Sequence, residues 1–169
     1  MTAADIPKTN GQPDQGFEGN RFTGIPLFDA LTHWDLSSAD KASVLIPGLA
    51  TEWKVDDADR TRWVFKLRPG VKFHDGTPFT AEDVAFSLTR YNHEQADMRG
   101  YTATIKEIKI VDPTTIDIMT KGPDPILPQQ LPLFFIMSKV WAEKNNTTQV
   151  VRGTSAPTFI NFNANGTGP

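Results

Sequence analysis

The fold of this chain is decided by residues 65–88, which read FKLRPGVKFHDGTPFTAEDVAFSL. The stretch begins as a strand, because Phe65 and Leu67 alternate with basic residues, and alternation is the period of a strand with one wet face. Asp75 and Gly76 then form a strong tight-turn pair, since glycine adopts positive φ at no steric cost. The stretch therefore predicts a strand followed by a turn.

A helix is expected directly after this turn. Thr80 has the residue type of an N-cap, and Glu82 and Asp83 fall in the first turn, where the helix dipole favours negative charge. We expect the helix to end at about Asn92. Its apolar residues share one face: Ala81, Val84, Ala85, Leu88 and Tyr91.

Two antiparallel hairpins flank this unit. The first joins residues 49–55 to residues 63–67, and the second joins residues 105–111 to residues 115–120, because each run alternates around a polar turn. Trp53 and Trp63 are expected on facing strands of the first hairpin. Core packing is the default for such aromatic pairs, with a stacking platform for a ligand as the alternative.

The remaining elements are short helices. Spacing of apolar residues predicts one over 25–34, and frequent prolines keep any helix in 126–131 brief. Residues 134–137 are expected as a buried strand or packed turn, and Ser138 as the cap of a helix that reaches Lys144. The predicted fold class is therefore α+β, with antiparallel hairpins packed against short helices.

Composition excludes several classes of protein. The chain has 169 residues, a net charge of −3 and no Cys. Without a basic cluster, nucleic acid is not an expected partner, and without Cys there is no disulfide, Cys-ligated metal or thiol nucleophile. No stretch approaches the roughly 18 apolar residues of a membrane helix, and residues 1–15 lack the apolar core of a signal peptide.

No catalytic residue, metal site or cofactor is predicted. His74 with Asp75 is better explained by the turn than by acid–base chemistry, because neither an orienting group nor a nucleophile is visible. His33 and His93 have no partner at metal-ligand spacing. The acidic run 56–59 lacks the glycine and glutamate of a calcium loop, so we interpret it as a solvated turn.

Residues 47–53 and 65–88 together closely resemble the signature of the extracellular solute-binding proteins (family 5) of peptide and nickel ABC transporters. Residues 166–169, which read GTGP, are similar to the element where chains of this family return from a small N-terminal subdomain to the main lobe. The resemblance covers most of residues 25–169.

The resemblance implies an incomplete first lobe of a two-lobed periplasmic-binding-protein fold. We expect an N-terminal arm and start of the main lobe in residues 1–32, the small subdomain with the signature in 33–145, and a return segment to the truncated main lobe in 146–169. Family members capture an oligopeptide or related small solute and deliver it to a membrane permease. By this resemblance the protein is periplasmic, monomeric when intact and not an enzyme, and its signature is architectural.

The same resemblance places ligand contacts on the arm and at the return element. On this chain these positions are Phe17, Glu18, Asn20, Arg21, Phe22, Thr167 and Gly168. Arg21 would pair with a substrate carboxylate, while Phe17 or Phe22 would pack against a side chain. An ordinary surface arm is the alternative at this site. The alternatives for the whole chain are a standalone protein-interaction module and, ranked last, an enzyme.

Overall fold

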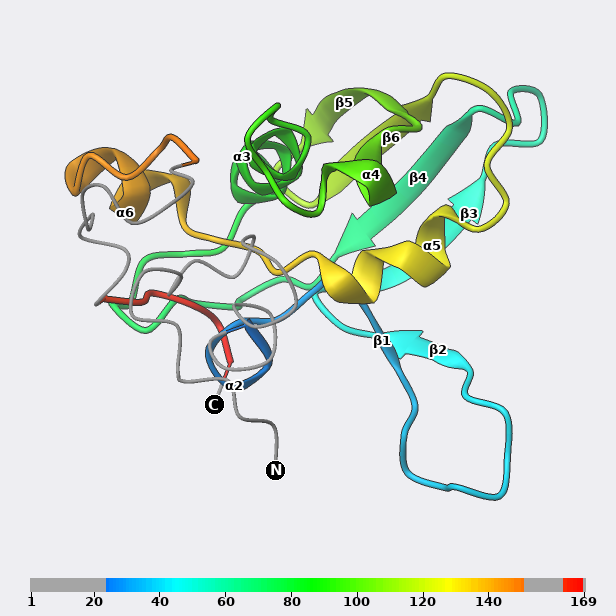
Figure 1. Ribbon diagram of the computed structural model, residues 1–169, viewed down its shortest axis with the longest axis horizontal. Helices are drawn as coiled ribbons and strands as arrows, with labels where there is room; N and C mark the ends of the chain where they lie inside the picture. Colours follow the sequence, from blue (N-terminus) through cyan, green and yellow to red (C-terminus); the bar gives the residue numbers. More distant parts are fainter. Residues whose placement is uncertain (1–23, 151–162, 169) are drawn as a thin grey trace.

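A computed structural model describes residues 24–150 and 163–168 (Figure 1). None of the helices in these ranges is both long and apolar enough to cross a membrane. The elements, in chain order, are α2 (Ile25–Leu27), β1 (Thr32–Trp34), β2 (Leu45–Pro47), β3 (Ala50–Val55), β4 (Arg62–Leu67), α3 (Ala81–Tyr91), α4 (Arg99–Thr102), β5 (Ile105–Asp112), β6 (Thr115–Thr120), α5 (Leu127–Gln130), the 3₁₀ turn η2 (Leu131–Leu133) and α6 (Lys139–Lys144).

Both predicted hairpins are confirmed, and they join into one antiparallel sheet with the strand order β3-β4-β6-β5. Trp53 lies opposite Phe65, and Trp63 lies opposite Val55. The two tryptophans are therefore on the same face of facing strands but are not directly paired. Both are partly buried against the core.

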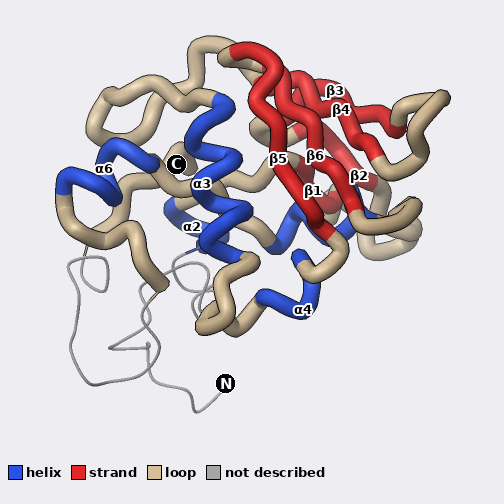
Figure 2. Tube along the Cα trace, turned by 90° about the horizontal axis from the view of Figure 1, so that it is seen from above, coloured by secondary structure: helices blue, strands red, loops and turns tan. Residues whose placement is uncertain are grey.

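The main core lies between one face of this sheet and the segments that cover it, which include α3 and α5 (Figures 1 and 2). Phe65, Ile116 and Ile118 point from the sheet into the core, because alternate residues of a strand face the same side. Val84 and Leu88 reach it from α3. The α+β class with short helices is confirmed.

Helix α3 begins as the sequence predicts. The backbone N–H of Thr80 donates to Asp83 Oδ2 (2.8 Å), which forms one half of a capping box. Asp83 is buried, and this burial raises the pKa of its carboxyl above the ordinary value of 3.8.

Polar side chains of α3 also accept hydrogen bonds from backbone N–H groups of residues 135–139. The sequence gives no sign of this arrangement. Three of these side chains, spaced four residues apart, accept hydrogen bonds from alternate N–H groups: Asp83 Oδ1 from Lys139 (2.8 Å), Ser87 Oγ from Met137 (2.8 Å) and Tyr91 OH from Phe135 (3.1 Å). The spacings match, because four helical residues rise about 6.0 Å and two extended residues about 6.6 Å. We call this set the α3 ladder.

The α3 ladder explains why residues 134–137 are buried without being a strand. On the side opposite α3, Ile136 donates its N–H to the carbonyl oxygen of Asp29 (2.9 Å). The segment is thus held between a helix and the chain before β1, and helical side chains take the place of a neighbouring strand. Ser138 then caps α6 as predicted, since its Oγ accepts from the N–H of Trp141 (3.2 Å).

The predicted helix over 25–34 is wrong beyond its first turn. Helix α2 ends at Leu27, Phe28 is already extended, and Thr32–Trp34 is strand β1, paired with β2. The apolar residues of 25–34 have the spacing of a helix face, but they do not share one environment in the structure. Leu31 packs into the main core, while Trp34 is partly exposed. Pairing with β2 across the loop 35–44 decides the conformation. Apolar side chains stay exposed on and beside this ribbon: Trp34, Leu36, Val44 and Ile46.

Candidate functional site

The predicted ligand-binding residues divide into two groups. Those on the N-terminal arm lie outside the described residues: Phe17, Glu18, Asn20, Arg21 and Phe22. Thr167 and Gly168 are described. They belong to residues 163–168, a described part of the predicted return segment, and from here on the name return segment refers to these six residues. The return segment lies beside α2 (Figure 1).

Two hydrogen bonds join the return segment to the chain around α2. The N–H of Gly168 donates to the carbonyl oxygen of Leu27 (3.2 Å), and Thr167 Oγ1 bonds Asp29 Oδ2 (3.1 Å). Asp29 also lies 3.6 Å from His33 Nε2. The nearby imidazole of His33 is the main cause that holds the pKa of Asp29 below 3.8, so the carboxylate stays ionised at neutral pH.

On its other side the return segment is hydrogen-bonded to residues 73–77, which we call the signature turn. The predicted turn is confirmed: Gly76 has φ +85°, and the N–H of Phe73 donates to the carbonyl oxygen of Thr77 (2.9 Å). The backbone N–H of His74 donates to the carbonyl oxygen of Gly166 (2.9 Å).

The imidazole of His74 uses both ring nitrogens on the return segment. Nδ1 accepts from the N–H of Gly166 (3.3 Å), so the ring proton of the neutral imidazole is on Nε2. Nε2 then donates to the carbonyl oxygen of Gly168 (2.9 Å). The next residue, Asp75, donates its N–H to Asn165 Oδ1 (3.1 Å). His74 therefore binds backbone, and its role here is structural.

Gly166 allows this close approach. A Cβ at that position would overlap the carbonyl oxygen of Leu27 and lie 2.9 Å from Phe28 Cδ1. Only a residue without a side chain fits between the signature turn and α2. The same holds less severely for Gly168, whose Cβ would lie 3.0 Å from the backbone nitrogen of Phe28.

We name the whole assembly, in which Asp29, His74 and the return segment are hydrogen-bonded, the junction. The sequence predicts a turn at His74, which the structure confirms, and gives no signal for Asp29. The signal that could have found their partner is the pair of glycines around Thr167, since closely spaced glycines mark places where backbone approaches backbone. The residues of the junction bond one another.

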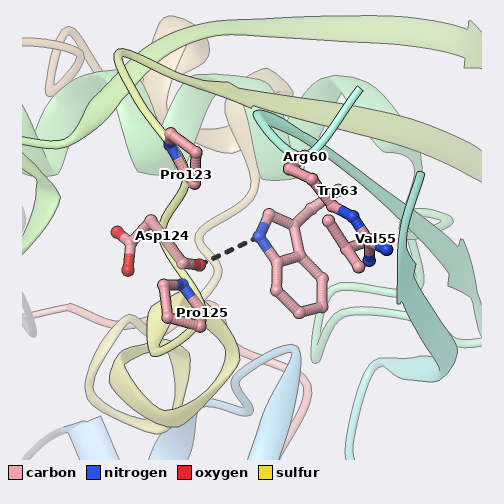
Figure 3. Close-up of a pocket in the computed structure, with 6 residues that line it drawn as sticks. All are labelled: Val55, Arg60, Trp63, Pro123, Asp124 and Pro125. Atoms are coloured by element: carbon pink, nitrogen blue, oxygen red, sulfur yellow. Dashed lines mark hydrogen bonds between the residues drawn. The ribbon is translucent and has the colours of Figure 1, made fainter. Parts of the chain in front are cut away.

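A cavity of about 250 Å³ opens at the other end of the sheet (Figure 3). Its lining comes from the ends of β3 and β4 and from the loop after β6: Val55, Arg60, Trp63, Pro123, Asp124 and Pro125. Trp63 Nε1 donates to the carbonyl oxygen of Asp124 (3.1 Å). The sequence predicts core packing for Trp63, with a stacking platform as the alternative, and the cavity shows that part of its indole is accessible.

The acidic run 56–59 forms the solvated turn that the sequence predicts. Asp56 Oδ1 accepts from the N–H groups of Ala58 (2.9 Å) and Asp59 (3.0 Å), and these bonds lower the pKa of Asp56. Within residues 24–150 and 163–168, no group of three or more His, Cys, Asp or Glu side chains is placed to hold a metal ion.

The architecture is that of periplasmic binding proteins. The chain superposes on NikA from Brucella suis, solved with Fe(III)-EDTA, with a TM-score of 0.74 and 23% identity, over 98% of this chain and 30% of that chain. It also superposes on the ABC transporter-associated periplasmic binding protein DppA from Helicobacter pylori, solved with the peptide STSA. There the TM-score is 0.71 and the identity 26%, over 95% of this chain and 34% of that chain.

Sequence comparison defines the family. Residues 44–169 match the bacterial extracellular solute-binding proteins, family 5 Middle, and the chain belongs to this family. The dipeptide-binding protein of Escherichia coli K12 is 29% identical to this chain, in an alignment that covers 95% of this chain and 33% of that protein. A probable peptide ABC transporter periplasmic-binding protein of Sinorhizobium fredii is 33% identical over 80% of this chain and 26% of its own length. The chain thus spans a third or less of these relatives.

Proposed function

We propose that this chain is part of the substrate-binding component of an ABC importer. It would capture an oligopeptide or related small solute in the periplasm and deliver it to a membrane permease, without catalysing a reaction. The observation that carries the proposal is the family match over residues 44–169, together with peptide-binding relatives that align with most of the chain.

The junction suggests how this chain contributes to capture. In a two-lobed binding protein the solute bridges both lobes and so favours the closed state. Such a mechanism needs the subdomain to be fixed to the main lobe. The bonds from His74 and Asp29 to the return segment would provide that attachment, while the signature turn itself stays away from the solute.

We place the solute against the N-terminal arm and the return segment. Thr167 Oγ1 is already bonded to Asp29, and the carbonyl oxygen of Gly168 accepts from His74. These two residues would therefore shape the wall of the cleft, and Arg21 would supply the charge that a solute carboxylate needs.

A chimera tests this function. We would replace the aligned third of the E. coli dipeptide-binding protein with this chain, confirm folding by circular dichroism, and titrate the product with dialanine, trialanine and glutathione. We expect calorimetric binding of at least one of these solutes and restored peptide uptake in a strain that lacks its own dipeptide-binding protein.

The matched control is the same chimera with Thr89→Ala, an exposed position of α3, which should behave like the parent chimera. A chimera that folds but binds none of the three solutes would contradict the proposal.

A further inference from the structure

The cavity beside Trp63 is a second place where this chain presents accessible, chemically distinct groups, and it shares no residue with the junction (Figure 3). Its walls are apolar on two sides. Val55 closes the β3 side, and Pro123 and Pro125 close the side of the loop. Neither proline has a backbone N–H, so these walls offer few polar groups and little flexibility.

Trp63 is held in one orientation. Its Nε1 donates to the carbonyl oxygen of Asp124 (3.1 Å), and its ring centroid lies 6.4 Å from that of Phe65 in the core. In Figure 3 the indole lies between Pro125 and Arg60. A fixed aromatic surface binds another ring without losing side-chain entropy, which favours a planar ligand.

Arg60 supplies a positive charge at the cavity. Arg62, two residues later, is held by Asp56 (3.3 Å) and Asp117 (2.8 Å), but no carboxylate among the described residues lies within ion-pair distance of Arg60. Asp59, which precedes Arg60, accepts its hydrogen bonds from Thr61 instead.

Among the described residues that line the cavity, Asp124 has the only acidic side chain, and it does not pair with Arg60. Figure 3 shows the carboxylate of Asp124 on the far side of the loop from the indole. One of its oxygens accepts from the N–H of Ile126 (3.2 Å), and the other is buried. The charge that faces the cavity is therefore positive.

We infer that this cavity is a binding site for a small aromatic carboxylate. The ring stacks on Trp63 between the two prolines and Val55, and the carboxylate takes a bidentate hydrogen bond from the guanidinium of Arg60. The size agrees, because an apolar cavity of about 150 Å³ is enough for benzene, and the additional volume holds a short acidic arm. The site does not depend on the proposed transport function.

The test is a titration of the full chain with 3-phenylpropionate, followed by the indole Nε1–H resonance of Trp63 in ¹H–¹⁵N spectra. We expect a saturable shift at millimolar ligand. Arg60→Gln should weaken this affinity about fivefold, because it removes one solvent-exposed charged hydrogen-bond partner. Arg60 is exposed, so the variant keeps the fold.

Two controls test whether the affinity depends on the ligand carboxylate and on the charge of Arg60. The neutral 3-phenylpropionamide should bind the wild type and Arg60→Gln equally. Lys54→Gln removes an exposed cation from β3 outside the cavity and should leave the affinity for 3-phenylpropionate unchanged. No shift at Trp63, or an equal affinity of the acid for wild type and Arg60→Gln, would overturn the inference.

Discussion

Gly166→Ala is expected to destabilise the protein by about 3 kcal/mol, because the new methyl group would overlap the carbonyl oxygen of Leu27. A backbone atom cannot move aside as a flexible side chain can. Either the return segment leaves its place, which breaks the bonds to His74, or the chain at α2 shifts. For a protein of this size the melting temperature should fall by about 6–12 °C.

Calorimetry of the variant measures this loss, and Gly100→Ala is the matched control. A Cβ at Gly100 would meet nothing within 4 Å, and this glycine lies in helix α4, where alanine is the better residue. Its melting temperature should be unchanged or slightly higher. Equal melting temperatures for Gly166→Ala and the wild type would show that the return segment does not pack against α2.

Ser87→Ala should cost about 1–3 kcal/mol, because it leaves buried backbone groups of Met137 without a partner. Ser87 is fully buried in the α3 ladder, and its Oγ accepts from the N–H of Met137 (2.8 Å) and contacts its carbonyl oxygen (3.3 Å). Alanine has the higher helix propensity, so helix formation alone predicts the opposite sign.

Chemical denaturation compares this variant with Thr89→Ala, which lies two residues further along the same helix and is exposed. Thr89→Ala should be neutral or stabilising. A stability of Ser87→Ala that equals that of Thr89→Ala would mean that the α3 ladder contributes nothing to folding.

The parts of the fold that follow from neighbouring residues could be predicted from the sequence. Each hairpin is specified by alternation around its own turn, and α3 by the cap at Thr80 and one apolar face. The Asp75–Gly76 turn needs only the positive φ of its glycine, which is +85°.

The parts that depend on distant residues could not be predicted. Residues 25–34 carry helical spacing, yet pairing with β2 makes their end a strand. The α3 ladder joins positions that are 44–56 residues apart in the chain, and helix side chains that act as the partner of an extended segment leave no periodic signal.

The junction at the candidate site could not be predicted either, because its bonded residues are distant in sequence. The resemblance singled out Thr167 and Gly168, but their partners His74 and Asp29 are 94 and 138 residues away in sequence. Nothing local identifies an imidazole that uses both nitrogens on a remote backbone. The cavity beside Trp63 likewise forms only when the loop after β6 crosses the β3–β4 hairpin.

The attachment of the return segment to the signature turn rests on His74. Amide hydrogen exchange of His74→Ala, read at Gly166 and Gly168 with Leu88 of α3 as the internal reference, tests this most directly. We expect faster exchange at both glycines and unchanged exchange at Leu88. Unchanged exchange at the two glycines in the variant would contradict it.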